Sequence, residues 1–203
     1  MMKKGLMIVV SGPAGCGKGT VNAHLLETGC FVYSVSATTR APRPGEIDGV
    51  NYHFITQEDF KQRIASGDML EYTEYCGNFY GTPKKEALEV LESGKNLILE
   101  IEVEGAHNIK KGFPEAILIM LLPPSHSVQE SRLRGRGTET EEKILERLER
   151  AKEEIYAAPD YDYVVYNYDG KDREAAEEIM KIIDAEHAAM RRNPDVVERF
   201  LND

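Results

Sequence analysis

The stretch Leu6-Met-Ile-Val-Val-Ser-Gly-Pro-Ala-Gly-Cys-Gly-Lys-Gly-Thr20 decides the fold of this chain. Its first five residues form a continuous apolar run, as in strands that a parallel sheet buries on both faces. Glycines end this run, and from Lys18 to Thr28 the apolar side chains recur at helical spacing until Gly29. The stretch therefore predicts a strand, a loop and a helix in direct succession.

Three further apolar runs, at residues 96–101, 116–122 and 163–165, alternate with helical patterns. This alternation is typical of a parallel sheet with helices on both faces. We therefore predict an α/β fold, a three-layer sandwich around a parallel sheet. Between residues 37 and 95 the chain has short alternating aromatic segments, which indicate a small mixed α/β insertion.

Several helix ends can be predicted from capping residues. The N-terminal signals are Thr56, Thr82 followed by Pro83 at the first helical position, and Thr138 with Glu141 three residues later. The first two helices are expected to end at Gly67 and Gly94. A last helix is expected over residues 172–190.

Composition and charge narrow the possible functions. The chain has 203 residues, with 25 Lys and Arg against 35 Asp and Glu, and a formal net charge of -10. This balance argues against nucleic-acid or anionic-lipid partners, so any anion must be held by a local site. The longest apolar run, residues 116–122, is far below the roughly 20 residues of a membrane span. Three cysteines without a CxxC pair fit a reducing cytosol, and we expect a cytoplasmic protein.

The loop after the first strand matches the pattern GxxxxGK, in which glycines let successive backbone N–H groups converge on phosphate oxygens. Lys18 would reach the β- and γ-phosphates of a nucleoside triphosphate. The strict pattern has Ser or Thr directly after the lysine to ligate Mg²⁺, whereas here Gly19 follows and the hydroxyl is on Thr20. The residues expected to bind the triphosphate are Gly12, Pro13, Ala14, Gly15, Cys16, Gly17, Lys18, Gly19 and Thr20.

Two carboxylates, Glu100 and Glu102, end the apolar run that begins at residue 96. Ligands of parallel sheets bind at the carboxyl ends of the strands, which is where these side chains are expected to lie. Either carboxylate could hold Mg²⁺ through water. Thr20 and Glu100 are therefore the candidate metal ligands.

Longer motifs follow in order along the chain. They are Ser34-Val-Ser-Ala-Thr-Thr-Arg-Ala-Pro-Arg-Pro-Gly-Glu-Ile-Asp-Gly-Val-Asn-Tyr-His-Phe54, Glu71-Tyr-Thr-Glu-Tyr-Cys-Gly-Asn-Phe-Tyr-Gly-Thr82, Arg132-Leu-Arg-Gly-Arg-Gly-Thr-Glu-Thr-Glu-Glu142 and Asp162-Tyr-Val-Val-Tyr-Asn167. Over roughly residues 6–185 the chain resembles the guanylate kinase family, the ATP:GMP phosphotransferases. The resemblance implies ATP as phosphoryl donor, GMP or dGMP as acceptor, Mg²⁺ as cofactor and a role in purine nucleotide metabolism.

By this resemblance the acceptor site has two parts. The phosphate of GMP would be bound by Arg40, Arg43, Tyr52 and Tyr80, and the guanine would be faced by Ser36, Glu71, Thr82 and Glu102. Guanidinium groups form forked hydrogen bonds to phosphate, and phenol hydroxyls add donors. Guanine offers N1–H and an exocyclic amine as adjacent donors that one carboxylate can accept together, and adenine lacks this pair. We therefore expect Glu71 to read the base.

The resemblance also assigns Arg132, Arg136 and Arg147 to a lid that joins Lys18 in catalysis, and places Asn167 near the adenine of ATP. Phosphoryl transfer needs little covalent work from the protein, so positive charge and exclusion of water supply most of the rate. The expected organisation is a single domain over residues 1–203, with a core at 1–36, 96–124 and 159–203, a GMP-binding region at 37–95 and a lid at 125–158.

The chain departs from the family at Glu100 and Glu102, where aspartate is usual. The extra methylene moves each carboxylate by roughly 1 Å or more. Two other functions use similar folds, namely phosphorylation of a sugar phosphate and partner binding by a non-catalytic domain. Glu71 argues against the first, because a base reader has no purpose there, and Lys18 with the lid arginines argues against the second.

Overall fold

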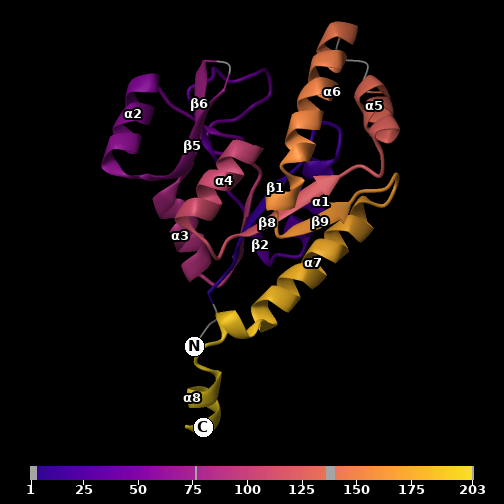
Figure 1. Ribbon diagram of the computed structural model, residues 1–203. Helices are drawn as coiled ribbons and strands as arrows, with labels where there is room; N and C mark the ends of the chain where they lie inside the picture. Colours follow the sequence, from indigo (N-terminus) through magenta and orange to yellow (C-terminus); the bar gives the residue numbers. More distant parts are fainter. Residues whose placement is uncertain (1–3, 76, 136–139, 203) are drawn as a thin grey trace.

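A computed structural model describes residues 4–75, 77–135 and 140–202 (Figure 1). The strands are β1 (Met7–Ser11), β2 (Phe31–Tyr33), β3 (Ala37–Thr38), β4 (His53–Phe54), β5 (Met69–Tyr75), β6 (Asn78–Pro83), β7 (Asn96–Leu99), β8 (Ile117–Leu122) and β9 (Tyr163–Tyr166). The α-helices are α1 (Lys18–Glu27), α2 (Gln57–Ser66), α3 (Lys84–Glu92), α4 (Val103–Gly112), α5 (His126–Gly135), α6 (Glu141–Tyr156), α7 (Asp172–Ala188) and α8 (Val196–Leu201). Two short 3₁₀ helices, Ala158–Asp160 and Met190–Arg192, follow α6 and α7.

The larger sheet is parallel and has five strands in the order β2-β7-β1-β8-β9. It confirms the predicted fold class, and strands β1, β7, β8 and β9 form at the four apolar runs. Alternate residues of a strand point to opposite faces, so Ile8 and Val10 of β1 pack in one apolar cluster and Met7 and Val9 in another. Every residue of β1 is buried, which explains why its sequence is apolar without alternation.

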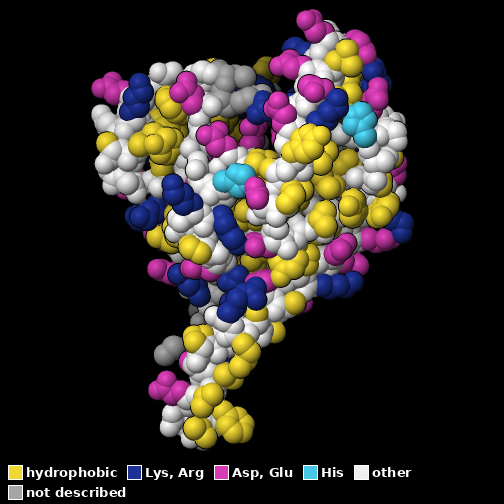
Figure 2. All heavy atoms as spheres, in the orientation of Figure 1, with side chains coloured by type: hydrophobic (Ala, Val, Ile, Leu, Met, Phe, Trp, Pro, Cys, Tyr) yellow, Lys and Arg dark blue, Asp and Glu magenta, His cyan; other side chains and the backbone are white. Residues whose placement is uncertain are grey.

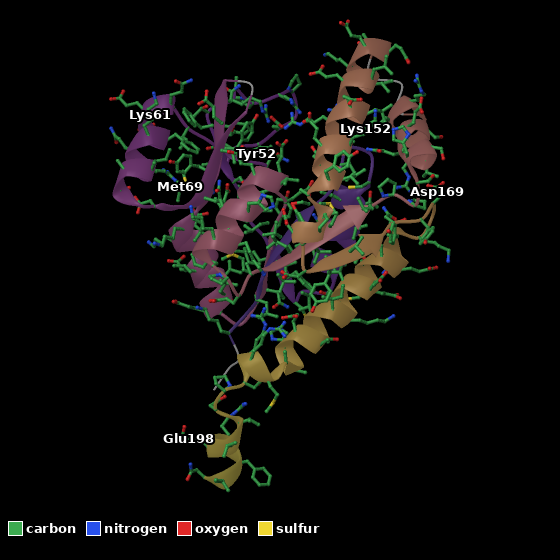
Figure 3. The ribbon with its side chains drawn as sticks, viewed as in Figure 1. Tyr52, Lys61, Met69, Lys152, Asp169 and Glu198 are labelled. Carbon is green, nitrogen blue, oxygen red and sulfur yellow. The ribbon has the colours of Figure 1, made fainter. Side chains whose placement is uncertain are left out.

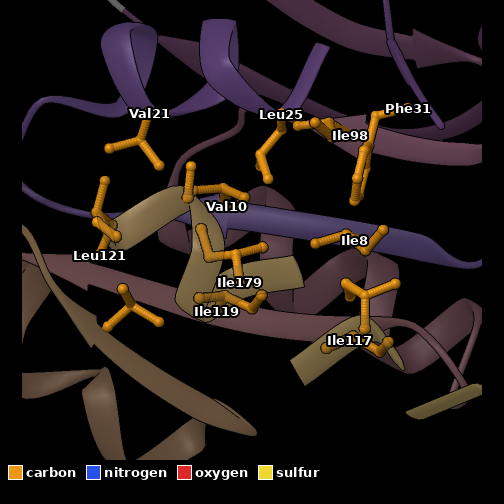
Figure 4. Packing of buried hydrophobic residues seen from close by; sticks show 14 of the residues in the cluster. Ile8, Val10, Val21, Leu25, Phe31, Ile98, Ile117, Ile119, Leu121 and Ile179 are labelled. Carbon is orange, nitrogen blue, oxygen red and sulfur yellow. The ribbon is translucent and has the colours of Figure 1, made fainter. Parts of the chain in front are cut away.

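Helices cover both faces of this sheet. Val21 and Leu25 of α1 and Ile179 of α7 pack against one face (Figure 4). On the other face the cluster includes Ala87 of α3 and Ile109 of α4. The chain therefore forms the predicted three layers, with β1 at the centre of the sheet.

The smaller sheet is mixed and has the order β4-β3-β6-β5. Strands β3 and β4 are parallel, whereas β6 is antiparallel to both β3 and β5. Phe60 of α2 is fully buried and stacks on Phe79 of β6 with ring centroids 5.4 Å apart. The predicted mixed α/β insertion is thus confirmed, while the helix α3 that follows it packs on the larger sheet.

Some of the predicted helix ends are confirmed and one is wrong. Thr56 is the N-cap of α2 and accepts a hydrogen bond from the backbone N–H of Asp59, and Gly67 ends the helix with φ of 74°. The predicted cap at Thr82 is wrong, because Thr82 and Pro83 still belong to β6 and α3 begins at Lys84 with Pro83 as its N-cap. Helix α6 begins at Glu141 with Thr140 as N-cap, and Thr138 lies outside the described residues.

The end of the chain extends away from the rest of the molecule. Helix α8 lies beyond the C-terminal end of α7 (Figure 1), and its hydrophobic side chains are visible on the surface (Figure 2). Val197, Phe200 and Leu201 are all exposed. None of the helices in the described part of the chain is long and apolar enough to cross a membrane.

Candidate active site

The glycine-rich loop connects β1 to α1 at the carboxyl end of the central strand. Gly15 and Gly17 have φ of 86° and 90°, in the left-handed region that favours glycine. A Cβ on Gly17 would lie 2.4 Å from Nδ2 of Asn167, so a side chain at this position would collide with a neighbouring residue. Lys18 folds back over the loop, and its Nζ donates to the carbonyl oxygen of Gly12 at 2.5 Å.

Residues from α5 and the end of β9 hold this loop in shape. Asn167 Nδ2 donates to the carbonyl oxygen of Cys16, and Gln129 Nε2 donates to that of Ala14, both at 2.9 Å. Arg132 donates to the carbonyl oxygens of Gly15 and Asn167 and pairs with Asp169 at 2.6 Å. Figure 3 shows Asp169 beside α5. These donors occupy carbonyl oxygens of the loop, so the loop is formed before any ligand arrives.

A cavity of about 360 Å³ lies between the loop, the mixed sheet and α6. Figure 3 shows Tyr52 between that sheet and α6. Ten of the residues predicted from the sequence line the cavity, namely Gly12, Ala14, Lys18, Ser36, Tyr52, Glu71, Tyr80, Glu100, Glu102 and Arg147. The fold therefore brings the phosphate loop, both predicted parts of the acceptor site and one lid arginine to a single space.

Glu71 has the most restricted surroundings of the cavity carboxylates. It is 6% exposed, and its Oε1 accepts a hydrogen bond from the hydroxyl of Thr82 at 2.8 Å. A Cβ on Gly105 would lie 3.1 Å from Glu71 Oε2, so glycine leaves room for the carboxylate beside α4. Burial raises the pKa of Glu71 to about 7, against the opposing effect of Thr82. The hydroxyl of Thr82 therefore binds a cavity carboxylate and does not cap α3.

Arg40 is held by a carboxylate that sequence reasoning missed. Its Nη2 and Nη1 contact Oε1 and Oε2 of Glu46 at 2.8 and 3.0 Å. Glu46 Oε2 also accepts from the backbone N–H of Arg43 at 2.6 Å. The Arg40 guanidinium lies 5.5 Å from the centre of the Tyr52 ring, which lines the cavity, whereas the Arg43 side chain is exposed. The hydrogen bonds from Arg40 lower the pKa of Glu46, which therefore stays ionised beside the arginine.

The two glutamates after β7 have different partners. Glu100 Oε2 accepts from Asn22 Nδ2 at 2.9 Å and from the hydroxyl of Tyr33 at 3.3 Å. Glu102 precedes α4 as its N-cap and accepts from Nη2 of Arg150 at 2.7 Å. Sequence reasoning missed Asn22, Tyr33 and Arg150, because their partners lie tens of residues away along the chain.

Some predicted residues, among them Thr20 and Cys16, are not among the residues that line the cavity. Thr20 is exposed on α1. Among the described residues there is no group of three or more His, Cys, Asp or Glu side chains that could hold a metal ion. Arg136 lies outside the described residues. Cys16 is buried, and burial raises the pKa of its thiol.

A phosphate loop at the end of a central parallel strand, open to a cavity with a buried carboxylate and three tyrosines, defines a nucleotide-binding phosphotransferase of the P-loop class. Comparison with known proteins gives the family. Residues 4–186 match the family model described as guanylate kinase. The chain belongs to the guanylate kinase family.

Individual relatives agree with this assignment over nearly the whole chain. A guanylate kinase of Lactococcus lactis is 48% identical over 203 residues, which are 100% of this chain and 97% of that protein. A guanylate kinase of Halalkalibacterium halodurans is 51% identical over 199 residues, 98% of this chain and 95% of that protein. The crystal structure of guanylate kinase from Anaplasma phagocytophilum superimposes with a TM-score of 0.75 at 34% identity, covering 94% of this chain and 90% of that one.

Proposed function

We propose that this chain transfers the γ-phosphoryl group of ATP to GMP or dGMP, giving ADP and GDP or dGDP. The observation that carries the proposal is Glu71, a buried carboxylate in the same cavity as Lys18 of the phosphate loop. A carboxylate there has a purpose if the acceptor carries a base with two adjacent donors. The formal charge of -10 supports small nucleotides as partners over nucleic acid.

On the donor side, the loop at residues 12–20 would bind the triphosphate through its backbone N–H groups. Lys18 would exchange the carbonyl oxygen of Gly12 for phosphate oxygens. Glu100 lies in the cavity with Lys18, and a single carboxylate beside phosphates suits Mg²⁺, which keeps several waters. When bound, the ion would neutralise part of the charge on the transferring group. Asn167, whose side chain donates to the carbonyl oxygen of Cys16 in the loop, would lie near the adenine of ATP.

On the acceptor side, Tyr52, Tyr80 and the two arginines at residues 40 and 43 would bind the phosphate of GMP. Ser36, Thr82 and Glu102 would surround the guanine together with Glu71. Glu71 accepts both donors of guanine only as a carboxylate, so it must lose the proton that burial favours. The acceptor is itself a phosphate oxygen, and transfer therefore needs no further general base.

The lid would form the third part of the site. Arg132, Arg136 and Arg147 would bring positive charge to the transferring phosphoryl group, and residues 125–158 would close over the cavity and exclude water. The core at 1–36, 96–124 and 159–203 would carry the donor site, and residues 37–95 the acceptor site. Cys16 and Cys30 are free thiols, which supports a reducing cytoplasmic setting. Phosphorylation of GMP would give the chain a role in purine nucleotide metabolism.

The test is a coupled assay of ADP release with ATP and each of GMP, AMP, CMP and UMP. We expect turnover with GMP, and we expect Lys18→Ala to remove nearly all of it while leaving the fold intact, because the Nζ of Lys18 donates to a carbonyl oxygen of the loop and its side chain is not part of the apolar core. Equal use of all four acceptors would reject Glu71 as base reader. Wild-type turnover in Lys18→Ala would reject the phosphate-loop assignment.

A further inference from the structure

An ion pair crosses the cavity from the lid helix to the guanine side. Arg150 of α6 places Nη2 at 2.7 Å from Oε2 of Glu102, the residue that precedes α4. The Nε of the same arginine lies 3.6 Å from Oε1 of Glu154, one turn further along α6. All three side chains line the cavity. Arg150 therefore connects two elements that are 48 residues apart in sequence.

The pair leaves half of the Glu102 carboxylate available. Oε2 accepts from Arg150, and within the described part of the chain Oε1 accepts no hydrogen bond. A carboxylate can accept about four hydrogen bonds, so Glu102 can keep Arg150 and accept a donor from a ligand at the same time. A glutamate also has one more rotatable bond than an aspartate, so holding its carboxylate in one position costs more side-chain entropy. Arg150 supplies that restraint before a ligand binds.

Glu102 and Glu71 lie at the same end of α4. Glu71 Oε2 reaches Gly105 in the first turn of that helix, and Glu102 is its N-cap. Two carboxylates that line one cavity match the three donor hydrogens that guanine presents on one edge, the N1–H and the two hydrogens of the exocyclic amine. Glu71 can accept N1–H and one amine hydrogen, which leaves the second amine hydrogen for Glu102.

We propose that Arg150 is a positioning residue that holds Glu102 toward the exocyclic amine of guanine and so contributes to acceptor specificity. The proposal rests on the proposed function, since it requires GMP as acceptor. It also gives the glutamate at position 102 a physical role, because its longer side chain is the one that Arg150 fixes across the cavity.

The test compares GMP with IMP, which lacks the exocyclic amine and keeps N1–H. Arg150→Met removes the donors and keeps much of the length of the side chain. We expect it to lower kcat/KM for GMP by about 3- to 10-fold, as for one weakened hydrogen bond to a charged group, mainly through KM. The value for IMP should stay unchanged. Lys152→Met on the same helix is the matched control, since Lys152 is exposed and pairs only with Glu149 among the described residues.

A second background makes the test independent of folding defects. In Glu102→Asp the shorter side chain falls short of Arg150, so adding Arg150→Met should not change the GMP-to-IMP ratio further. Tighter GMP binding in Arg150→Met would overturn the proposal, because Arg150 would then compete with guanine for Glu102. An equal loss of kcat with both nucleotides would also overturn it and would assign Arg150 to phosphoryl transfer. Failure of the wild-type protein to phosphorylate GMP would instead reject the proposed function.

Discussion

At the scale of single residues, Glu71 combines burial with a task that needs charge. Burial raises its pKa to about 7, so this carboxyl takes up and releases a proton near neutral pH. Only the ionised form accepts both donors of guanine. In the proposed complex, hydrogen bonds from GMP to this carboxylate would offset the cost of burying its charge.

This state of Glu71 predicts a pH dependence of GMP binding. As the pH falls from about 8 to about 5.5, protonated Glu71 accumulates and the affinity for GMP should fall about tenfold per pH unit below the pKa. Titration calorimetry over this range measures the effect. In Glu71→Gln the affinity should be low and should keep only the pH dependence of the GMP phosphate, whose second pKa is about 6. A wild-type pH dependence no steeper than that of Glu71→Gln would contradict the role of Glu71.

Glu46 is a second residue whose charge serves a neighbour. It holds Arg40 by two hydrogen bonds and Arg43 by its backbone N–H. We expect Glu46→Gln to raise KM for GMP about tenfold with little change in kcat, because Arg40 loses its fixed position beside Tyr52. Steady-state kinetics tests this. Glu58→Gln, an exposed change on α2, is the control, and an unchanged KM for GMP in Glu46→Gln would exclude the positioning role.

At the scale of elements, local sequence patterns predicted what local interactions determine. The strand, loop and helix of residues 6–29 were predictable because glycines, apolar periodicity and the helix stop all lie within that stretch. The cap at Thr82 was mispredicted because its hydroxyl bonds to Glu71 on the neighbouring strand, which no local pattern reveals. The partners Arg150 and Glu102 were equally hidden, since the fold alone brings them together.

Helices α1 and α7 are joined by an ion pair whose strength depends on pH. His24 Nε2 lies 2.5 Å from Oδ2 of Asp172, at the first residue of α7. Hydrogen bonding to Asp172 raises the pKa of His24, and His24 in turn lowers the pKa of Asp172. The pair is charged only while His24 is protonated and Asp172 is ionised.

The direction of the His24 shift gives the expected effect on stability. A raised histidine pKa stabilises the folded state below the ordinary value of 6.5, and this contribution is lost as the pH rises through the folded-state value. His24→Ala should therefore lower the unfolding midpoint more at about pH 5.5 than at about pH 9. Thermal unfolding at both pH values measures the difference, with His107→Ala as a surface control. If His24→Ala lowers the unfolding midpoint equally at both pH values, packing and not the ion pair joins the helices.

At the scale of the whole molecule, the phosphate loop follows a strand of the parallel sheet, whereas most of the proposed acceptor residues belong to the mixed sheet and its loops, and both parts line one cavity. Each nucleotide should therefore stabilise the protein on its own. A ligand at about 100 times its Kd adds about 2.7 kcal/mol to the free energy of unfolding. In Lys18→Ala we expect the rise in Tm with GMP to remain and the rise with a non-hydrolysable ATP analogue to be largely lost. If thermal-shift measurements show that Lys18→Ala loses the rise in Tm with both ligands, the two sites are not separable.

The mixed sheet is built from one uninterrupted stretch of chain, from β3 at residue 37 to the end of β6 at residue 83. The chain leaves the parallel sheet once to form it and returns once. In evolutionary terms most of the proposed acceptor site is a cassette, because a single segment carries Arg40, Tyr52, Glu71 and Tyr80 and can be replaced while the strand order of the parallel sheet stays the same. Glu102 and Arg150 lie outside that cassette, so a transplanted acceptor segment would bring its own Glu71 but would depend on its new host for the second carboxylate and its arginine.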